Sequence, residues 1–116
     1  METYVPVLPI IDVKSFDQTI ESHSVVVILA WVSWDPASRR FDLWLRQACD
    51  SYKNLHFYAM DIDQEQNWPF AVEWGMMTTP TLICIFNGVF HEKQVGLGPE
   101  PQISAKLSEW NSLSGK

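Results

Sequence analysis

A continuous apolar segment, Val25 to Trp31, constrains the fold of this chain more than any other feature. Its residues are largely β-branched and do not alternate with polar residues, which is typical of a strand covered on both faces of a sheet. Trp34-Asp35-Pro36 follows, and Asp and Pro favour the first positions of a helix. The sequence thus predicts a central strand that leads into a helix start, where unpaired backbone N–H groups and the helix dipole can serve a functional site.

The chain length and composition indicate a single folded domain. With 116 residues, 47% of them hydrophobic and 19% charged, the chain is long enough for one core and has the composition of a globular protein. We therefore expect residues 1–116 to form one domain.

The net charge of -6 argues against direct nucleic-acid binding, which relies on clustered Lys and Arg. Met1 to Ile10 lacks the features of a secretory signal, and no apolar run is long enough to span a membrane. We expect an intracellular protein, cytoplasmic or nuclear, that binds other proteins and no membrane. Cys49 and Cys84 match no zinc or redox spacing, so they are predicted to be buried free thiols, with no metal or cofactor.

A long helix is predicted after Asp35-Pro36. Its apolar residues recur at spacings of three and four, so that one face packs on the sheet; they are Phe41, Trp44, Leu45, Ala48, Cys49 and Tyr52. The solvated face is expected to carry Arg39, Arg40, Asp42, Arg46, Gln47 and Asp50.

The remaining elements alternate between strand and helix patterns. Asn87-Gly88 is a strong signal for a tight hairpin turn. The predicted elements are a short edge strand Tyr4–Val7, a helix from a capping box at Ser15 to near His23, a strand Leu55–Ile62, a helix Gln66–Trp74 that ends at Gly75, a hairpin of Thr81–Phe86 and Val89–Val95, and a last helix with Ile103, Leu107 and Trp110 on its apolar face. The order is β-α-β-α-β-α-β-β-α, which favours an α/β fold with a central mixed sheet flanked by helices.

The chain resembles the thioredoxin superfamily over nearly its whole length. The residues that carry the resemblance are Ser15-Phe16-Asp17, Val25 to Trp31, Trp34, Ile62-Asp63-Gln64, Thr79-Pro80-Thr81, Phe86-Asn87-Gly88 and Val95-Gly96. The resemblance implies the thioredoxin fold, and it implies that the peptide bond before Pro80 is cis and flanks the active site.

Thioredoxin enzymes carry a Cys-x-x-Cys pair where this chain has Asp35-Pro36-Ala37-Ser38. A carboxylate and a hydroxyl cannot perform disulfide exchange, which needs an attacking thiolate and a resolving thiol. Leu29 and Ala59 stand where the family has a buried carboxylate and a buried lysine. We therefore expect a redox-inactive member that is not an enzyme.

A narrower resemblance is to the small thioredoxin-like subunit of spliceosomal ribonucleoproteins. It rests on Trp34-Asp35-Pro36, on Asp42, and on Gly96-Leu97-Gly98 after the last strand. Ala37-Ser38 departs from that branch. This resemblance implies a role in a spliceosomal or other multiprotein assembly.

The helix start and the segment around Pro80 are expected to form a partner-binding groove, because exposed aromatic patches often mark interaction surfaces. Its predicted residues are Trp34, Asp35, Pro36, Ala37, Ser38, Ile62, Thr79, Pro80, Val95, Gly96 and Leu97. Trp74 and Met76-Met77 extend it.

Purely structural interpretations of the helix start compete with these functional ones. Asp35 either only caps the helix or also contacts a partner, and no second titratable group is evident to make it catalytic. Ser38 lacks a base, since His23, His56 and His91 fall on a loop and two strands. No catalytic residue is assigned.

Three functional hypotheses follow. The leading one is a redox-inactive adaptor that acts through the groove. The alternative is a thiol oxidoreductase or chaperone-like relative that uses Cys49 or Cys84 with an external thiol such as glutathione. A third is a scaffold whose contacts lie on the helix with Arg39, Arg40 and Arg46.

Overall fold

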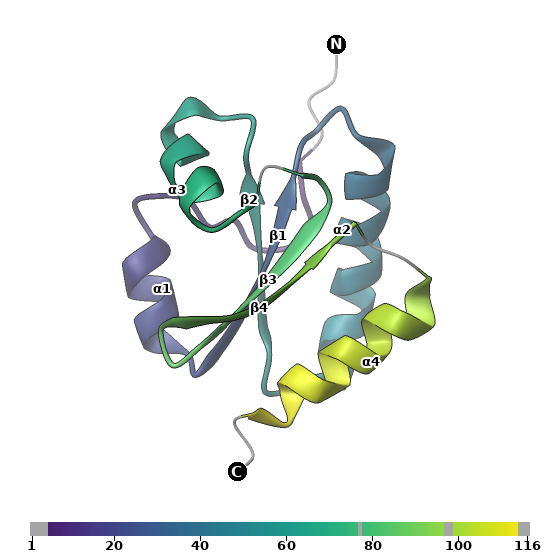
Figure 1. The fold of residues 1–116 in the computed structure, drawn as a ribbon. Helices are drawn as coiled ribbons and strands as arrows, with labels where there is room; N and C mark the ends of the chain where they lie inside the picture. The colour runs from purple at the N-terminus through teal and green to yellow at the C-terminus, as the bar shows by residue number, and fades with distance from the viewer. Residues whose placement is uncertain (1–4, 77, 97–98, 114–116) are drawn as a thin grey trace.

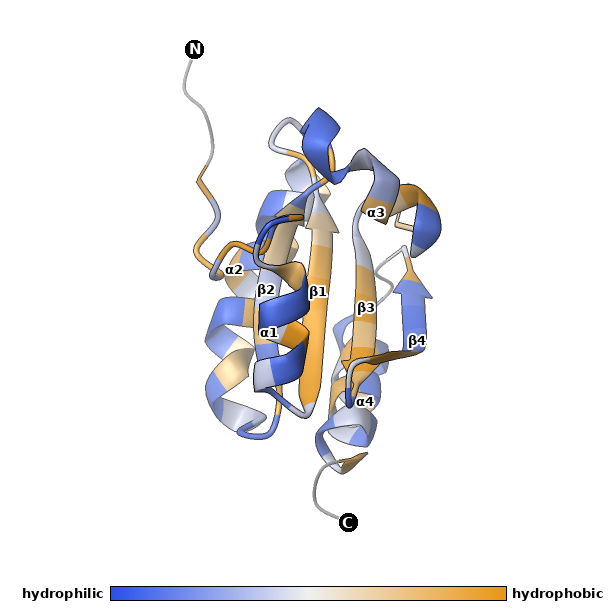
Figure 2. Cartoon of the chain, turned by 90° about the vertical axis from the view of Figure 1, so that its left-hand side faces the viewer, coloured by the Kyte–Doolittle hydropathy of each residue, from blue (hydrophilic) through white to orange (hydrophobic). Residues whose placement is uncertain are grey.

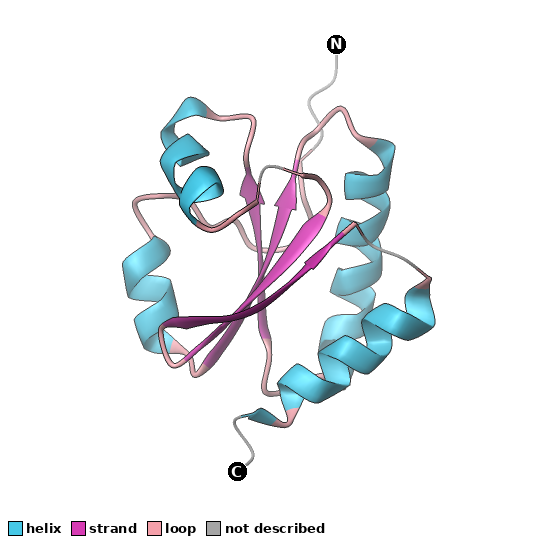
Figure 3. Ribbon diagram, in the orientation of Figure 1, coloured by secondary structure: helices cyan, strands magenta, loops and turns pink. Residues whose placement is uncertain are grey.

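The computed structural model describes residues 5–76, 78–96 and 99–113. Four strands form one sheet in the order β2-β1-β3-β4, with four α-helices around it (Figures 1 and 3). The elements are α1 (Phe16–Ser22), β1 (Val25–Trp31), α2 (Pro36–Ala48), η1 (Cys49–Ser51), β2 (His56–Asp61), η2 (Glu65–Asn67), α3 (Trp68–Glu73), β3 (Thr81–Phe86), β4 (Val89–Val95) and α4 (Glu100–Asn111). The predicted mixed-sheet α/β architecture is confirmed.

The central strand β1 is the axis of the fold. It pairs in parallel with β2 and antiparallel with β3, and all seven of its residues are buried. Helices α2 and α4 cover one face of the sheet, whereas α1 and α3 cover the other (Figure 1). Both faces of β1 are thus shielded from solvent, which explains its unbroken apolar sequence.

Each face of the sheet has its own hydrophobic cluster, because successive side chains of a strand point in opposite directions. Val25, Val27, Leu29 and Trp31 pack with α2 and α4, and Val26, Ile28 and Ala30 pack toward α1 and α3. Figure 2 shows β1 and β3 as the apolar centre between helices with polar outer faces. The core therefore holds the sheet in place, and the carboxyl end of β1 positions the loop that carries Trp34.

Asp42 lies on the inner side of α2, so its predicted place on the solvated face is wrong. Its side chain is fully buried and accepts hydrogen bonds from the backbone N–H of Val7 at 2.8 Å and of Leu8 at 3.1 Å. A buried carboxylate needs such partners. The helical spacing did not reveal this role because the N–H donors come from a distant segment.

The N-terminal segment does not form the predicted edge strand. Tyr4 lies outside the described residues, and residues 5–7 are irregular. The backbone of the segment pairs with the sheet at an isolated parallel bridge between Ile10 and Ala59. Asp42 satisfies the backbone of Val7 and Leu8, so no strand partner is needed there.

The hairpin is confirmed. Asn87 and Gly88 both have positive φ, 52° and 79°, as a two-residue turn of the primed type requires. β3 and β4 pair antiparallel, with a register shift between Cys84 and Ile85. This hairpin makes β4 one edge of the sheet.

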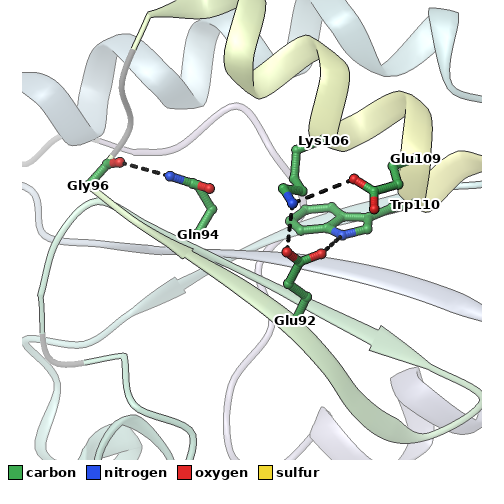
Figure 4. Close-up of polar contacts among 6 residues, drawn as sticks. All are labelled: Glu92, Gln94, Gly96, Lys106, Glu109 and Trp110. Carbon is green, nitrogen blue, oxygen red and sulfur yellow. Dashed lines mark hydrogen bonds and ion pairs between the residues drawn. The ribbon is translucent and has the colours of Figure 1, made fainter.

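Helix α4 is joined to β4 by polar contacts as well as by its buried Ile103, Leu107 and Trp110. The Glu92 carboxylate accepts from the Trp110 indole N–H at 2.9 Å and pairs with Lys106 at 2.7 Å (Figure 4). Figure 4 also shows Glu109 on the far side of the Lys106 ammonium, at 3.5 Å. The last helix is therefore held at a fixed place on the sheet.

The two short helices differ in detail from the prediction. Ser15 is the N-cap of α1, but its hydroxyl makes no capping bond and instead contacts Asp12. The expected helix from Gln66 begins as the 3₁₀ turn η2, and α3 proper starts at Trp68. Gly75 follows with φ of 69°, in keeping with its predicted role at the helix end.

Candidate functional site

The Asp35 carboxylate accepts several hydrogen bonds at the start of α2. One carboxylate oxygen accepts from the N–H of Ala37 at 3.1 Å, and the other accepts from the hydroxyls of Ser38 at 3.0 Å and Thr79 at 3.3 Å. Ser38 is fully buried, and its hydroxyl also lies 3.5 Å from the N–H of Val32. Asp35 thus caps the helix, places a negative charge at its positive end, and ties the loop of Thr79 to it.

The peptide bond between Thr79 and Pro80 is cis, as the family resemblance implied. The Pro80 carbonyl accepts from the N–H of Gly96 at 3.2 Å. The segment before β3, the end of β4 and the start of α2 are therefore brought together. Of the predicted groove residues, these contacts join Asp35, Ala37, Ser38, Thr79, Pro80 and Gly96.

The other predicted groove residues differ in exposure. Trp34 is 69% exposed and Val95 is 46% exposed, whereas Ile62 is 7% exposed. Pro80 is also buried, and Leu97 lies outside the described residues. Trp34 is the large apolar side chain that this face presents to a ligand. Use of the face as a groove stays a prediction.

The proposed extension of the groove is wrong at Met76, which is fully buried in the cluster under α1 and α3. Met77 lies outside the described residues. Trp74 is half-buried and packs on Phe16, with ring centroids 5.4 Å apart, and near Phe90, at 6.1 Å. Its ring therefore serves the core more than a binding face.

No ionisable group lies at the two family positions under the site, because Leu29 and Ala59 are fully buried apolar residues. A carboxylate does lie nearby at the end of β2, where burial raises the pKa of Asp61 above its ordinary value. It borders a hollow of about 320 Å³ together with Trp31, Asp12 and Asn67. Sequence inspection missed this hollow because its walls come from three separate segments.

Cys49 is half-exposed, which corrects its predicted buried place. It follows the last residue of α2, and its Sγ accepts from the Arg46 guanidinium at 3.1 Å and donates to the Arg46 carbonyl at 3.0 Å. It borders a hollow of about 880 Å³ with Lys53, Tyr52 and Tyr58 among its other walls. The helical spacing placed Cys49 on the apolar stripe but did not show that α2 ends just before it.

Cys84 is a buried free thiol, as predicted. Burial, and then the negative charge of Glu92, raise the pKa of the Cys84 thiol to about 12. Thiol chemistry needs the thiolate, so Cys84 is inert near neutral pH. Cys49 is the accessible thiol of the two.

Two of the three histidines, which the sequence separates, are stacked against each other. The rings of His23 and His56 have centroids 3.7 Å apart and an interplanar angle of 15°. His91 is exposed on β4. None of them reaches Ser38 through a hydrogen bond shown by the described residues, and within those residues no three His, Cys, Asp or Glu side chains gather as a metal ion would require.

Comparison with known proteins agrees with this fold. The thioredoxin family model matches residues 7–109, and the chain belongs to this family. Thioredoxin from Chlorobaculum thiosulfatiphilum is 26% identical over 98 residues, which cover 83% of this chain and 89% of that protein. Thioredoxin-2 from Pyricularia oryzae is 23% identical over 95 residues, covering 82% of this chain but 54% of that protein.

Solved structures show the same fold. Thioredoxin from Malassezia sympodialis has 25% identity and a TM-score of 0.77, with 95% of this chain and 97% of that chain covered. A mutant thioredoxin from Halobacterium salinarum has 19% identity and a TM-score of 0.79, with 97% and 98% covered.

These comparisons contradict the prediction of a redox-inactive adaptor that is not an enzyme. The relatives are named thioredoxins, and thioredoxins are disulfide oxidoreductases; none of these names indicates an adaptor. The loss of the pair at Asp35 and Ser38 removes thiols from the helix start, but it does not remove the exposed thiol of Cys49. The absence of cysteines at the start of α2 was therefore wrongly taken to mean that the whole chain is redox-inactive.

Among the described helices, none is both long and apolar enough to cross a bilayer.

Proposed function

We propose that this member of the thioredoxin family is a thiol–disulfide oxidoreductase that uses Cys49 as its nucleophile, with an external thiol such as glutathione as the second reactant. The observation that carries the proposal is the contact of the Arg46 guanidinium with Cys49 Sγ at 3.1 Å. Cations beside a cysteine are a feature of reactive thiols. Cys84, by contrast, is fully buried and has the negative charge of Glu92 beside it.

The reaction has two exchange steps at Cys49. The Cys49 thiolate attacks one sulfur of a substrate disulfide, so that a mixed disulfide forms and the other substrate sulfur leaves as a thiolate, which takes up a proton. A glutathione thiolate then attacks the substrate sulfur of the mixed disulfide, which releases Cys49 as a thiolate and joins substrate and glutathione in a new disulfide. Negative charge passes over the attacking and leaving sulfurs, next to Arg46. Away from Cys49, a second glutathione thiolate displaces the substrate sulfur, which leaves as a thiolate and takes up a proton, and the oxidised glutathione so formed is what glutathione reductase reduces.

The surroundings of Cys49 suit a small or flexible disulfide. Arg46 and Lys53 border the same hollow as the thiol, and the buried Leu55 and Phe57 give it an apolar floor. Because α2 has 13 residues and rises 1.5 Å per residue, Cys49 lies about 20 Å from the helix start. The chemistry thus takes place at the opposite end of the helix from the family's usual site.

The test is turnover of a disulfide substrate with glutathione and glutathione reductase. We expect turnover by the wild-type chain that is lost in Cys49→Ser and kept in Cys84→Ser, the matched control. Arg46→Gln should retain the fold and lower the rate several-fold. Turnover that survives Cys49→Ser, or that the wild-type chain lacks with both insulin and a small disulfide, would refute the proposal.

A second candidate function is chaperone-like binding at the face of Trp34, which the 69% exposure of this indole supports. An unfolded protein segment would cover the ring and the neighbouring Val95. Suppression of the aggregation of reduced insulin chains tests it, with Trp34→Ser as the variant and Trp68→Ser, at a second exposed tryptophan, as the control. Equal suppression by all three proteins would exclude this role for Trp34.

The branch of the family stays a separate proposal. The resemblance to the small spliceosomal subunit is supported by Trp34-Asp35-Pro36 and Asp42. Recovery of spliceosomal proteins with the tagged chain would support that branch, and their absence would count against it.

A further inference from the structure

The C-terminal end of α1 meets the start of β2 through two stacked imidazoles. His23 is the C-cap residue of α1 and His56 is the first residue of β2. Their ring centroids lie 3.7 Å apart at an interplanar angle of 15°. The Tyr58 hydroxyl, also on β2, lies 3.3 Å from Nε2 of His23. This histidine pair, His23 and His56, therefore links a helix end to an inner layer of the fold.

Face-to-face stacking of this kind is compatible with two neutral imidazoles, or with one neutral and one protonated imidazole. Two imidazolium rings at 3.7 Å would place two positive charges in contact without an anion between them. Glu21 borders a hollow with His23, while Arg46, Asp50 and Lys53 border the other hollow with His56. The β3–β4 turn beside His23 contributes Asn87 and Gly88, which carry no charge.

We propose that the histidine pair is a pH-sensitive latch: the rings stay stacked while at least one imidazole is neutral, and protonation of both separates the rings and frees the end of α1 from β2. The latch acts in the range where histidine titrates. It does not depend on the chemistry of Cys49.

The direction of the effect follows from the environment of His56. Burial, and then the positive charge of His23, lower the pKa of His56 below its ordinary value. A histidine whose pKa is lowered in the folded chain contributes stability above its unfolded value of about 6.5. That contribution is lost as the pH falls from there toward the folded pKa. Acidification thus opens the latch.

The protonation of the pair is tested by an NMR titration of the three histidines between pH 8 and 4.5. We expect His56 to titrate below the ordinary histidine value of about 6.5, and its midpoint to move up in His23→Asn. His91→Asn is the matched control and should leave the His56 midpoint in place. An unchanged His56 midpoint in His23→Asn would overturn the proposal. If that variant does not fold, His23→Gln removes the same charge and gives the same test, with the same outcome as refutation.

The opening step is tested by hydrogen exchange. Protection factors of α1 should fall several-fold as His56 takes up its proton. Those of the first turns of α2 should stay constant, because α2 begins after the opposite end of β1 from the residue that pairs with His56. In His56→Phe an aromatic ring can stack but cannot gain a charge, so α1 should keep its protection at low pH. Protection of α1 that does not change with pH in the wild-type chain, or that changes equally in His56→Phe, would exclude the latch.

Discussion

The Thr79 hydroxyl donates a hydrogen bond to the Asp35 carboxylate at 3.3 Å, across 44 residues of sequence. The residue before the cis-proline thereby contacts the first residue before α2. Asp35 also accepts from Ala37 and Ser38. One carboxylate thus organises the position at which other thioredoxins carry cysteines.

Replacing Asp35 with Ala should destabilise the chain by about 1–2 kcal/mol, since an N-cap bond is lost together with the acceptor for two hydroxyls. Asp35→Asn retains a capping oxygen and should cost less than half as much. Urea unfolding measures both. Equal losses in the two variants would mean that the charge, not the capping oxygen, is what stabilises the helix start.

The double variant D35C/S38C should acquire insulin reductase activity that does not need Cys49. The backbone already has the helix start and the cis-proline loop, and the two substitutions supply an attacking and a resolving thiol. The single variant D35C in a Cys49→Ser background, assayed without glutathione, is the control and should form mixed disulfides without turnover. Absence of activity in a folded D35C/S38C variant would show that Leu29 and Ala59, beneath the site, are incompatible with dithiol chemistry.

Asp42→Ala should cost about 3 kcal/mol of unfolding free energy, because the N–H groups of Val7 and Leu8 lose their acceptor. Asp42→Asn keeps one acceptor oxygen and should cost less. The exposed Asp50→Ala, at the end of the same helical region, is the control and should be nearly neutral. Hydrogen exchange should locate the loss in residues 7–11, and a uniform loss across the sheet would contradict the assigned role.

Glu92 should make the chain sensitive to acid. Its hydrogen bonds with Lys106 and then Trp110 lower the pKa of the Glu92 carboxyl (Figure 4). A carboxyl with a lowered pKa contributes stability above its unfolded value, about 4.3, and this stability is lost as the pH falls toward the folded value. Glu92→Gln should therefore be less stable at pH 7 but lose less stability between pH 5 and 2.

Urea unfolding at a series of pH values measures this difference. Glu109→Gln, which removes the more distant partner of Lys106, is the control and should retain most of the wild-type pH dependence. If the unfolding free energies of the wild-type chain and Glu92→Gln changed with pH by the same amount, Glu92 would not be the source of the acid sensitivity.

Local sequence patterns predicted most of the fold, because the spacing of apolar residues along a strand or helix indicates which of its faces is buried. The unbroken run Val25 to Trp31 indicated a strand with two dry faces, and Asn87-Gly88 indicated the hairpin turn. The same patterns failed at Asp42, whose partners lie 34 and 35 residues away. They also failed at residues 5–7, the described part of the predicted strand, where the backbone N–H of Val7 bonds to that carboxylate instead of to a strand.

The candidate site divides in the same way. The sequence alone determined which groups stand at the helix start: Asp35 and Ser38 in place of thiols, and therefore no disulfide chemistry at that end of α2. Only the tertiary structure decided which cysteine is accessible, because exposure depends on where α2 ends and on what covers β3. It also brought His23 and His56 into contact, since a helix end and a strand start become neighbours only when the chain packs.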